Sequence, residues 1–307
     1  MSRNLLFICN PYAGKSGIKH NIAEILDVFI KSGYRVEVHL TQSAGDATNI
    51  VSERGTQFSR IVCGGGDGTL NETVSGLMRI PKELRPPLGY IPAGTQNDFA
   101  RNLSIPFVHS QAAAIACGEE THMIDVGKIN SGFFNYVCGF GAFTEVSYET
   151  RQEIKKLLGV PAYGIEAVKS FMHLKPYHLT VSFNGREMTD DFMIILVGNS
   201  ISIGGIKGLL GDKIVMDDGL FEVFMVTNPS GIAGWNDVIG NVFQDHGKNP
   251  TVHRFKTGQI EFFSEERLKW VKDGEYAGDL NYVKITNEHK ALEIACRIQI
   301  GARWPDN

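Results

Sequence analysis

Residues 61–72 read Ile-Val-Cys-Gly-Gly-Gly-Asp-Gly-Thr-Leu-Asn-Glu, and they form the most informative motif of the sequence. The apolar residues 61–63 predict a buried strand, and Thr69 is expected to open a helix. Glycines between them would permit positive φ and let backbone N–H groups approach a phosphate, while the helix N-terminus adds positive charge. Asp67 would repel a phosphate, so its presence indicates Mg²⁺ or a reacting hydroxyl. A plain turn with an aspartate cap would need one glycine, not four.

Strand and helix patterns alternate on both sides of this turn. Strands are predicted at residues 5–9, 34–40, 61–63 and 88–91, and helices at 18–30, around 46–54 and at 70–78. This alternation indicates a parallel sheet with right-handed crossovers, in which ligands bind at the carboxyl ends of the strands. Residues 1–122 are therefore predicted to form an α/β domain.

After about residue 122 the pattern changes to apolar runs separated by turns. Asn130-Ser131-Gly132 resembles a hairpin turn, and Asn184-Gly185 is a strong type I′ signal. Strands are predicted at residues 123–129, 133–140, 179–183, 187–189, 193–197, 221–226, 259–263 and 282–285. Two helices are predicted near 149–158 and 165–174. Residues 123–292 are thus expected to form a β-rich domain, with a cleft between it and the first.

A second loop follows the first predicted strand, where residues 10–17 read Asn-Pro-Tyr-Ala-Gly-Lys-Ser-Gly. It is not a Walker A loop, because that pattern would need glycine in place of Cys9. A Gly-Lys-Ser turn ahead of a helix can still hold a nucleotide phosphate. A purely structural turn is the alternative.

A third loop follows the strand at 88–91, where residues 91–101 read Ile-Pro-Ala-Gly-Thr-Gln-Asn-Asp-Phe-Ala-Arg. Gly94 and Thr95 form another strand-to-helix junction. Asn97 and Asp98 would by themselves be explained as helix caps. Three such junctions at the carboxyl ends of three strands, however, predict a ligand site at that edge.

Composition excludes several classes of protein. Lys plus Arg is 30 and Asp plus Glu is 34, so the net charge of −4 argues against a nucleic-acid binder. The longest apolar runs are far shorter than the ~20 residues of a transmembrane helix, and the N-terminus has no signal-peptide pattern. A cytoplasmic protein is expected. Five cysteines without a CxxC pair predict buried thiols rather than disulfides or zinc ligands.

The three loops together resemble the diacylglycerol kinase catalytic-domain family, particularly its soluble bacterial lipid-kinase branch, which is related to sphingosine and ceramide kinases. Further matches lie in the second half of the chain: Asp125-Val126-Gly127 with Gly139-Phe140-Gly141, Asp217-Asp218-Gly219-Leu220, and Asp273-Gly274-Glu275. The Gly-Gly-Asp-Gly-Thr core alone is less specific, because NAD kinases and phosphofructokinases share it or a close form. The segment around Asn97 and the late Asp-Gly-Glu favour the lipid kinases.

The resemblance implies an α/β nucleotide domain of the NAD kinase and diacylglycerol kinase type, followed by a C-terminal β-sandwich. A final segment at about 293–307 would return to the first domain. The implied reaction is ATP-dependent phosphorylation of a lipid hydroxyl, with diacylglycerol or a related glycerolipid as acceptor and Mg²⁺ as cofactor.

The resemblance also implies roles for individual residues. The nucleotide-binding positions are Asn10, Pro11, Tyr12, Ala13, Gly14, Thr41, Gly65, Gly66, Asp67, Gly68, Thr69, Leu70, Asn71 and Thr95. Glu275 corresponds to the proton acceptor, and Asp67 would anchor Mg²⁺. A structural Mg²⁺ is implied at the carbonyls of Val215 and Leu220 with Asp218. Asp98 and Asp125 would either complete a carboxylate network or serve as a helix cap and a strand-end turn.

One residue departs from the family's pattern, in which a short apolar run precedes the late aspartate. Lys272 stands there instead. It would either act on the charge of Glu275 or point outward along its strand, and strand alternation favours the outward position.

A lipid substrate implies peripheral contact with a membrane. Two segments combine basic and apolar residues, namely Arg151, Lys155, Lys156, Leu157, Leu158 and Tyr163, and Arg254, Phe255 and Lys256. Either can equally be an ordinary amphipathic surface. Exposed strand edges would support a homodimer or be covered by loops. An NAD kinase-like enzyme and a non-catalytic nucleotide- or lipid-binding protein remain the alternatives.

Overall fold

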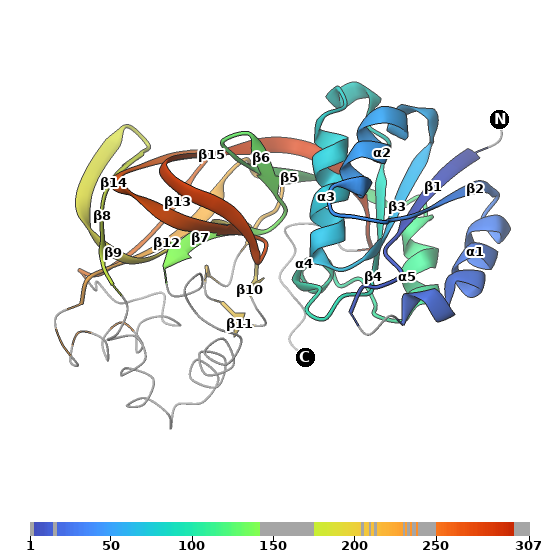
Figure 1. Ribbon diagram of the computed structural model, residues 1–307, viewed down its shortest axis with the longest axis horizontal. Coiled ribbons are helices and arrows are strands. Elements are labelled where there is room, and N and C mark those ends of the chain that lie inside the picture. Colours follow the sequence, from blue (N-terminus) through green and yellow to red (C-terminus); the bar gives the residue numbers. More distant parts are fainter. Residues whose placement is uncertain are drawn as a thin grey trace.

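The computed structural model describes residues 3–14, 17–141, 175–203, 206–208, 210–211, 214–229, 231, 234, 238 and 250–297. It has two lobes, an α/β lobe and a β-rich lobe, joined by a long strand (Figure 1). The predicted fold class is confirmed. The helices predicted at 149–158 and 165–174, and the basic segment from Arg151 to Tyr163, lie outside the described residues.

The first lobe is built on four parallel strands in the order β2-β1-β3-β4. Its strands are β1 (Arg3–Cys9), β2 (Tyr34–Leu40), β3 (Arg60–Gly65) and β4 (Leu88–Pro92). Its helices are α1 (Ile22–Lys31), α2 (Asp46–Arg54), α3 (Asp67–Met78), α4 (Asp98–Asn102) and α5 (His109–Ala116), with 3₁₀ turns at Ile18–His20, Gly55–Gln57 and Lys82–Leu84. Figure 1 shows α2 and α3 on one side of the sheet and α1 and α5 on the other. The predicted strands and helices of this lobe are confirmed, except that the first helix starts as a 3₁₀ turn.

The second lobe is built mainly on strands that continue the same hydrogen-bonded sheet in the order β13-β12-β9-β7-β14-β15, whereas β10 and β11 form a separate two-stranded sheet. Its strands are β5 (Thr121–Ile129), β6 (Gly132–Phe134), β7 (Val137–Gly141), β8 (Tyr177–Phe183), β9 (Arg186–Gly198), β10 (Ser202–Ile203), β11 (Ile206–Lys207), β12 (Phe221–Thr227), β13 (Val252–Thr257), β14 (Gln259–Lys272) and β15 (Glu275–Ala295). The predicted hairpin at Asn184-Gly185 joins β8 to β9, and both residues have positive φ.

Two strand predictions in this lobe are wrong in detail. Residues 133–140 do not form one strand, because β6 pairs with β5 whereas β7 pairs with β9 and β14. Residues 187–189 and 193–197 belong to one strand, β9. The apolar run in β9 is buried on both faces, since Ile195 and Val197 lie in the core of the β-rich lobe while Ile194 and Leu196 lie in the other hydrophobic cluster.

Strand β15 links the two lobes. It runs antiparallel to β14 and β5, and near its end Ile294 pairs in parallel with Leu88 of β4. Side chains of the first lobe fix this crossing: Arg85 donates from Nη1 to the carbonyl of Ala291 at 2.6 Å, and Lys82 donates to the carbonyl of His289 at 3.1 Å. The start and the end of β15 therefore lie in different lobes.

Two expectations from composition can be compared with the described residues. All five cysteines are free thiols and buried, as predicted. None of the helices that the structure describes is long and apolar enough to cross a membrane.

Candidate functional site

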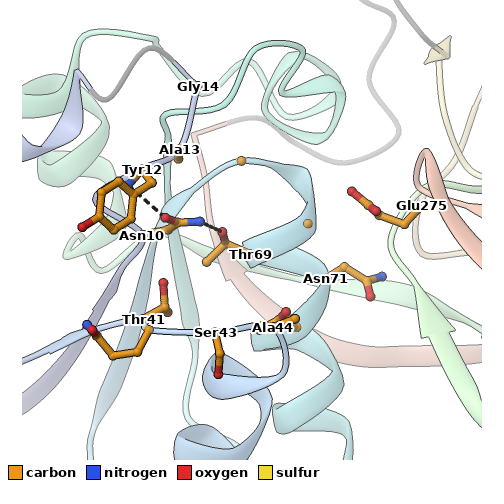
Figure 2. Close-up of a pocket in the computed structure, with 14 residues that line it drawn as sticks. Asn10, Tyr12, Ala13, Gly14, Thr41, Ser43, Ala44, Thr69, Asn71 and Glu275 are labelled. Atoms are coloured by element: carbon orange, nitrogen blue, oxygen red, sulfur yellow. Dashed lines mark hydrogen bonds between the residues drawn. The ribbon is translucent and has the colours of Figure 1, made fainter.

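The cleft lies at the topological switch point of the parallel sheet. Helix α1, which follows β1, covers one face of the sheet, and helix α3, which follows β3, covers the other (Figure 1). Such a reversal opens a crevice at the carboxyl ends of the two strands. A cleft of about 580 Å³ is found there (Figure 2). It is lined by Asn10, Tyr12, Ala13, Gly14, Thr41, Gln42, Ser43, Ala44, Gly66, Gly68, Thr69, Asn71, Glu72 and Glu275.

Most of the residues assigned from the sequence to nucleotide binding or catalysis line this cleft. The ones that do not are Pro11, Gly65, Asp67, Leu70 and Thr95. Thr95 is exposed on the third loop, and Leu70 is fully buried in α3.

Sequence reasoning missed part of the lining, namely Gln42, Ser43, Ala44 and Glu72. The first three follow β2 at the same edge of the sheet as the other loops, so their position after a strand was the available signal. Glu72 holds this loop in place, because its Oε1 accepts a hydrogen bond from the backbone N–H of Gly45 at 2.8 Å.

The glycines at the end of β3 and directly after it serve close packing rather than unusual backbone angles. A Cβ on Gly64 would lie 2.7 Å from Cδ1 of Ile18, and one on Gly65 would lie 2.6 Å from Cβ of Thr69. A Cβ on Gly66 would lie 3.2 Å from Cα of Gly94 in the third loop. None of these residues, nor Gly68, all within the described part of the chain, has a positive φ. The positive φ that glycine permits is therefore not used at this turn.

The first loop is tied to the other two. The side-chain amide of Asn10 donates to Oγ1 of Thr69 at 3.2 Å, and its Oδ1 accepts from the backbone N–H of Tyr12 at 3.0 Å (Figure 2). Gly14 has φ +54°, and a Cβ there would lie 2.5 Å from the carbonyl oxygen of Ala93. Glycine is thus required at position 14, where the first loop touches the third.

Asn97 shapes the third loop. It has a left-handed backbone with φ +53°, its Oδ1 accepts from the backbone N–H of Gly94 at 2.9 Å, and its Nδ2 donates to the carbonyl of Gly94 at 2.8 Å. Asparagine tolerates this conformation better than most residues. Asn97 therefore fixes the turn, and the next residue, Asp98, is buried at the start of α4.

Asp67 lies at the start of α3 beside other carboxylates. Burial, together with the charges of Asp98 and Asp273, raises the pKa of Asp67 to about 6, although hydrogen bonds from the backbone N–H groups of Phe99 and Asn97 act in the opposite direction. Its Oδ1 is buried and has no hydrogen-bond partner among the residues that the structure describes. A buried carboxylate oxygen without a donor, next to further negative charge, fits a site for a hard divalent cation such as Mg²⁺.

Asp273 and Gly274 form the turn between β14 and β15, with φ of +48° and +83°. These angles are those of a two-residue type I′ turn, for which Asp-Gly is a preferred sequence. The carboxylate of Asp273 accepts four hydrogen bonds: from the backbone N–H groups of Asn135, Tyr136 and Val137 at 2.6, 3.0 and 3.2 Å, and from Nδ2 of Asn71 at 2.9 Å. It thereby joins the β-rich lobe to α3 of the first lobe.

Glu275 follows this turn as the first residue of β15 and reaches the cleft from the second lobe (Figure 2). Its Oε1 would lie 3.4 Å from a Cβ placed on Gly68, near the N-terminus of α3. The prediction that Lys272 points outward is wrong. Its ammonium group donates to the carbonyl of Phe133 at 3.0 Å and reaches Oδ1 of Asn71 at 3.5 Å, so it lies at the junction of the two lobes.

Asp125 does not join the carboxylates at the cleft. Its Oδ2 accepts from the backbone N–H of Gly219 at 2.8 Å, and its Oδ1 accepts from that of Lys290 at 2.8 Å and lies 3.1 Å from Nδ1 of His289. These contacts fix the turn before β12 against β15. Of the two roles considered for Asp125, these contacts fit the structural one rather than a place in a carboxylate network.

In the turn assigned to a structural Mg²⁺, the carboxylate of Asp218 already contacts other groups of the protein. Oδ1 of Asp218 accepts from the backbone N–H of Leu220 at 3.0 Å, and its Oδ2 lies 3.3 Å from the ammonium group of Lys256. That ammonium group also lies 2.7 Å from Oε1 of Glu222. Lys256 thus pairs with the carboxylate of Asp218 in this structure, and the assignment of a structural Mg²⁺ to Val215, Asp218 and Leu220 stays a prediction.

Comparisons with known proteins agree with this architecture. A family model described as the diacylglycerol kinase catalytic domain matches residues 4–129, and one described as a YegS C-terminal NAD kinase beta sandwich-like domain matches residues 139–296. A diacylglycerol kinase of Bacillus subtilis (strain 168) is 33% identical over 276 residues, covering 89% of this chain and 90% of that protein. One from Staphylococcus carnosus (strain TM300) is 33% identical over 283 residues, covering 91% of each.

A solved structure is also similar. The crystal structure of a putative diacylglycerol kinase from Bacillus anthracis str. Sterne has a TM-score of 0.79 at 27% identity, covering 96% of this chain and 97% of that one. The chain therefore belongs to the diacylglycerol kinase family. It is a lipid kinase, and ATP is its phosphoryl donor.

The substitution Asp67→Asn should stabilise the metal-free protein at neutral pH. Folding raises the pKa of Asp67 from 3.8 to about 6, so the folded state binds more protons than the unfolded chain between these values. The protein therefore loses stability as the pH rises through this window. An amide has no such dependence, so the advantage of the variant should grow from near zero below about pH 4 to about 1–3 kcal/mol at neutral pH.

Urea unfolding in EDTA across this pH range measures the difference. Asp46→Asn is the control of opposite sign, because hydrogen bonds from the backbone of Gln42 and from His39 lower the pKa of Asp46. That variant should be less stable than the unaltered protein above about pH 4, and the difference should disappear as the pH falls through the lowered folded-state pKa of Asp46. An Asp67→Asn protein that is less stable at neutral pH would contradict the electrostatic account of the cleft.

Proposed function

We propose that this lipid kinase transfers the γ-phosphoryl group of ATP to the free hydroxyl of diacylglycerol, giving phosphatidic acid and ADP. The observation that carries the proposal is the placement of Glu275. Its carboxylate comes from the β-rich lobe, yet it faces Gly68 at the start of α3, within the same cleft as the three loops of the first lobe.

The phosphates of ATP are assigned to one end of the cleft. Gly14, Gly66, Gly68 and Thr69 line this end, where the N-terminus of α3 favours negative charge and the absence of Cβ atoms allows close approach. Asp67, with Asp98 beside it, would hold Mg²⁺, which neutralises the phosphate charge when bound.

Glu275 is assigned as the general base. In this step the acceptor oxygen attacks the γ-phosphorus, Glu275 takes the hydroxyl proton, and the bond between the γ-phosphorus and the bridging oxygen of ADP breaks. The role requires the carboxylate within hydrogen-bond distance of the acceptor oxygen. Because Glu275 starts β15, and β15 also pairs with the sheet of the first lobe, its backbone is well fixed.

Glu275→Gln should lower kcat by about 10²- to 10⁴-fold while the KM for ATP stays within about twofold, because the amide keeps the shape but cannot accept the proton. Transfer of label from γ-labelled ATP to diacylglycerol in detergent micelles measures this. Glu265→Gln on the neighbouring strand β14, also an exposed glutamate, is the control and should keep normal turnover. Label in NAD but not in lipid, or normal turnover of Glu275→Gln, would contradict the proposal.

The base of ATP is assigned to the other end of the cleft, beside Tyr12 and the loop of Thr41 to Ala44. The Tyr12 side chain is 78% exposed although it lines the cleft, and the hydrogen bond from its backbone N–H to Oδ1 of Asn10 fixes the backbone that carries the ring. An exposed aromatic ring at the border of a cleft is a surface on which a nucleobase can stack.

Tyr12→Ala should therefore raise the KM for ATP by about 5- to 100-fold with little change in kcat, because a stacking contact contributes about 1–3 kcal/mol. Tyr12→Phe should behave like the unaltered protein, since it keeps the ring. Steady-state kinetics with varied ATP measures both, and Tyr282→Ala, another exposed tyrosine, is the control. An equal rise in the KM of Tyr12→Phe would assign the effect to the hydroxyl instead.

A further inference from the structure

An apolar pair projects from the loop between α4 and α5. Phe107 is 46% exposed and Val108 is 54% exposed, and they are the only consecutive large apolar residues among the exposed ones that the structure describes. The residues before them are well anchored, since Leu103 and Ile105 are each only 2% exposed.

Phe107 and Val108 are exposed because hydrogen bonds fix the backbone on both sides of them. The N–H of Ile105 donates to the carbonyl of Ala100, and the carbonyl of Val108 accepts from the N–H of Ala112 in the first turn of α5, each at 2.9 Å. Phe107 and Val108 are therefore held outward between two packed segments.

The pair lies at the edge of the sheet that carries the active site. The loop follows β4 at its carboxyl end, at the lower edge of the α/β lobe in Figure 1. The neighbouring loop after β1 is linked to it, because the side chain of Asn21 lies 2.8 Å from Nδ1 of His109. The phosphate-binding loops and the apolar pair thus face the same side of the molecule.

Positive charge accompanies the pair. The guanidinium group of Arg101 lies 4.9 Å from the centre of the Phe107 ring and is exposed, and Lys19 is exposed on the neighbouring 3₁₀ turn. Burial lowers the pKa of His109, while the carboxylate of Glu24 acts in the opposite direction. An exposed aromatic ring beside a guanidinium group is typical of a protein surface that contacts anionic lipid headgroups.

The other apolar and basic segment within the described residues is engaged internally. The Phe255 ring stacks on Phe183 with centroids 4.0 Å apart, and Lys256 is paired with Asp218 and Glu222. Arg254 lies 4.8 Å from the ring centre of Phe224. The segment 254–256 therefore offers less free apolar surface than the pair at 107–108.

From these observations we infer that Phe107 and Val108, with Arg101, form the surface by which the protein docks on an anionic lipid bilayer. We call Phe107, Val108 and Arg101 the docking tip. The inference rests on the proposed function, because a kinase for a bilayer lipid must bring its cleft to the membrane. With the docking tip in the headgroup region, the active-site edge of the sheet faces the bilayer.

Binding to vesicles tests the docking tip without reference to catalysis. The double variant Phe107→Ser with Val108→Ser should bind equimolar phosphatidylcholine–phosphatidylglycerol vesicles about ten- to a hundredfold more weakly than the unaltered protein. Phe263→Ser on β14, where the phenylalanine is 52% exposed, is the matched control and should bind normally. Arg101→Gln should reduce the preference for these vesicles over pure phosphatidylcholine.

A fluorescent label gives a second measurement that does not depend on loss of function. Because the five native thiols are buried, Phe107→Cys and Phe263→Cys can each be labelled selectively with an environment-sensitive dye. The label at 107 should shift to the blue when vesicles are added, and the label at 263 should not. A shift at 107 that follows protein concentration without vesicles would identify a second copy of the chain as the occupant and overturn the inference.

Activity on a short-chain diacylglycerol dissolved without vesicles separates this inference from the proposed function. The double variant should phosphorylate it at the normal rate. If no diacylglycerol is phosphorylated by the unaltered protein, the proposed function fails, whatever the vesicles show. If phosphorylation is normal but the double variant binds vesicles as well as the unaltered protein, or if Phe263→Ser loses binding equally, the docking tip is wrong.

Discussion

The arrangement of the cleft depends on one buried carboxylate. Asp273 accepts hydrogen bonds from three consecutive backbone N–H groups of the β-rich lobe and from the side chain of Asn71 in α3. A buried charge is costly unless donors surround it, and here four donors do. The same residue starts the type I′ turn that directs Glu275 toward Gly68. One side chain therefore fixes the contact between the lobes and the direction of the proposed base.

Strand β15 connects the two lobes that line the cleft. It begins at Glu275 in the cleft, pairs with β14 and β5, and ends beside β4 in the sheet of the α/β lobe. Arg85 and Lys82 hold its crossing through backbone carbonyls. The loops of the α/β lobe and Glu275 of the β-rich lobe line one cleft from different lobes. Strand β15 is shared by both lobes and therefore holds these two sides of the cleft in place.

Much of the fold was predictable from the sequence because its signals are local. The strand at 34–40 alternates in hydrophobicity, and Asn184-Gly185 has the chemistry of one turn type, so both predictions were confirmed.

The cleft was located by the loops at 10–17 and 61–72, but the glycines act through close packing, which needs the positions of Ile18, Thr69 and Gly94 in space. The direction of Lys272 was wrongly predicted and the role of Asp125 was left open for the same reason, since their partners are more than ninety residues away in sequence. The loop at 42–44 carries no motif, so its position after a predicted strand was the only sequence signal that it lines the cleft.

The most direct test of this account is a kinetic comparison of Asp273→Asn, Glu275→Gln and the double variant. Asparagine tolerates the positive φ of the turn, but its amide nitrogen cannot accept the hydrogen bonds that one carboxylate oxygen now accepts. If Asp273 acts by placing Glu275, Asp273→Asn should lower kcat for lipid phosphorylation, and the double variant should be no slower than Glu275→Gln alone. Normal kcat in a folded Asp273→Asn protein, or a double variant slowed by the product of the two single effects, would contradict the account.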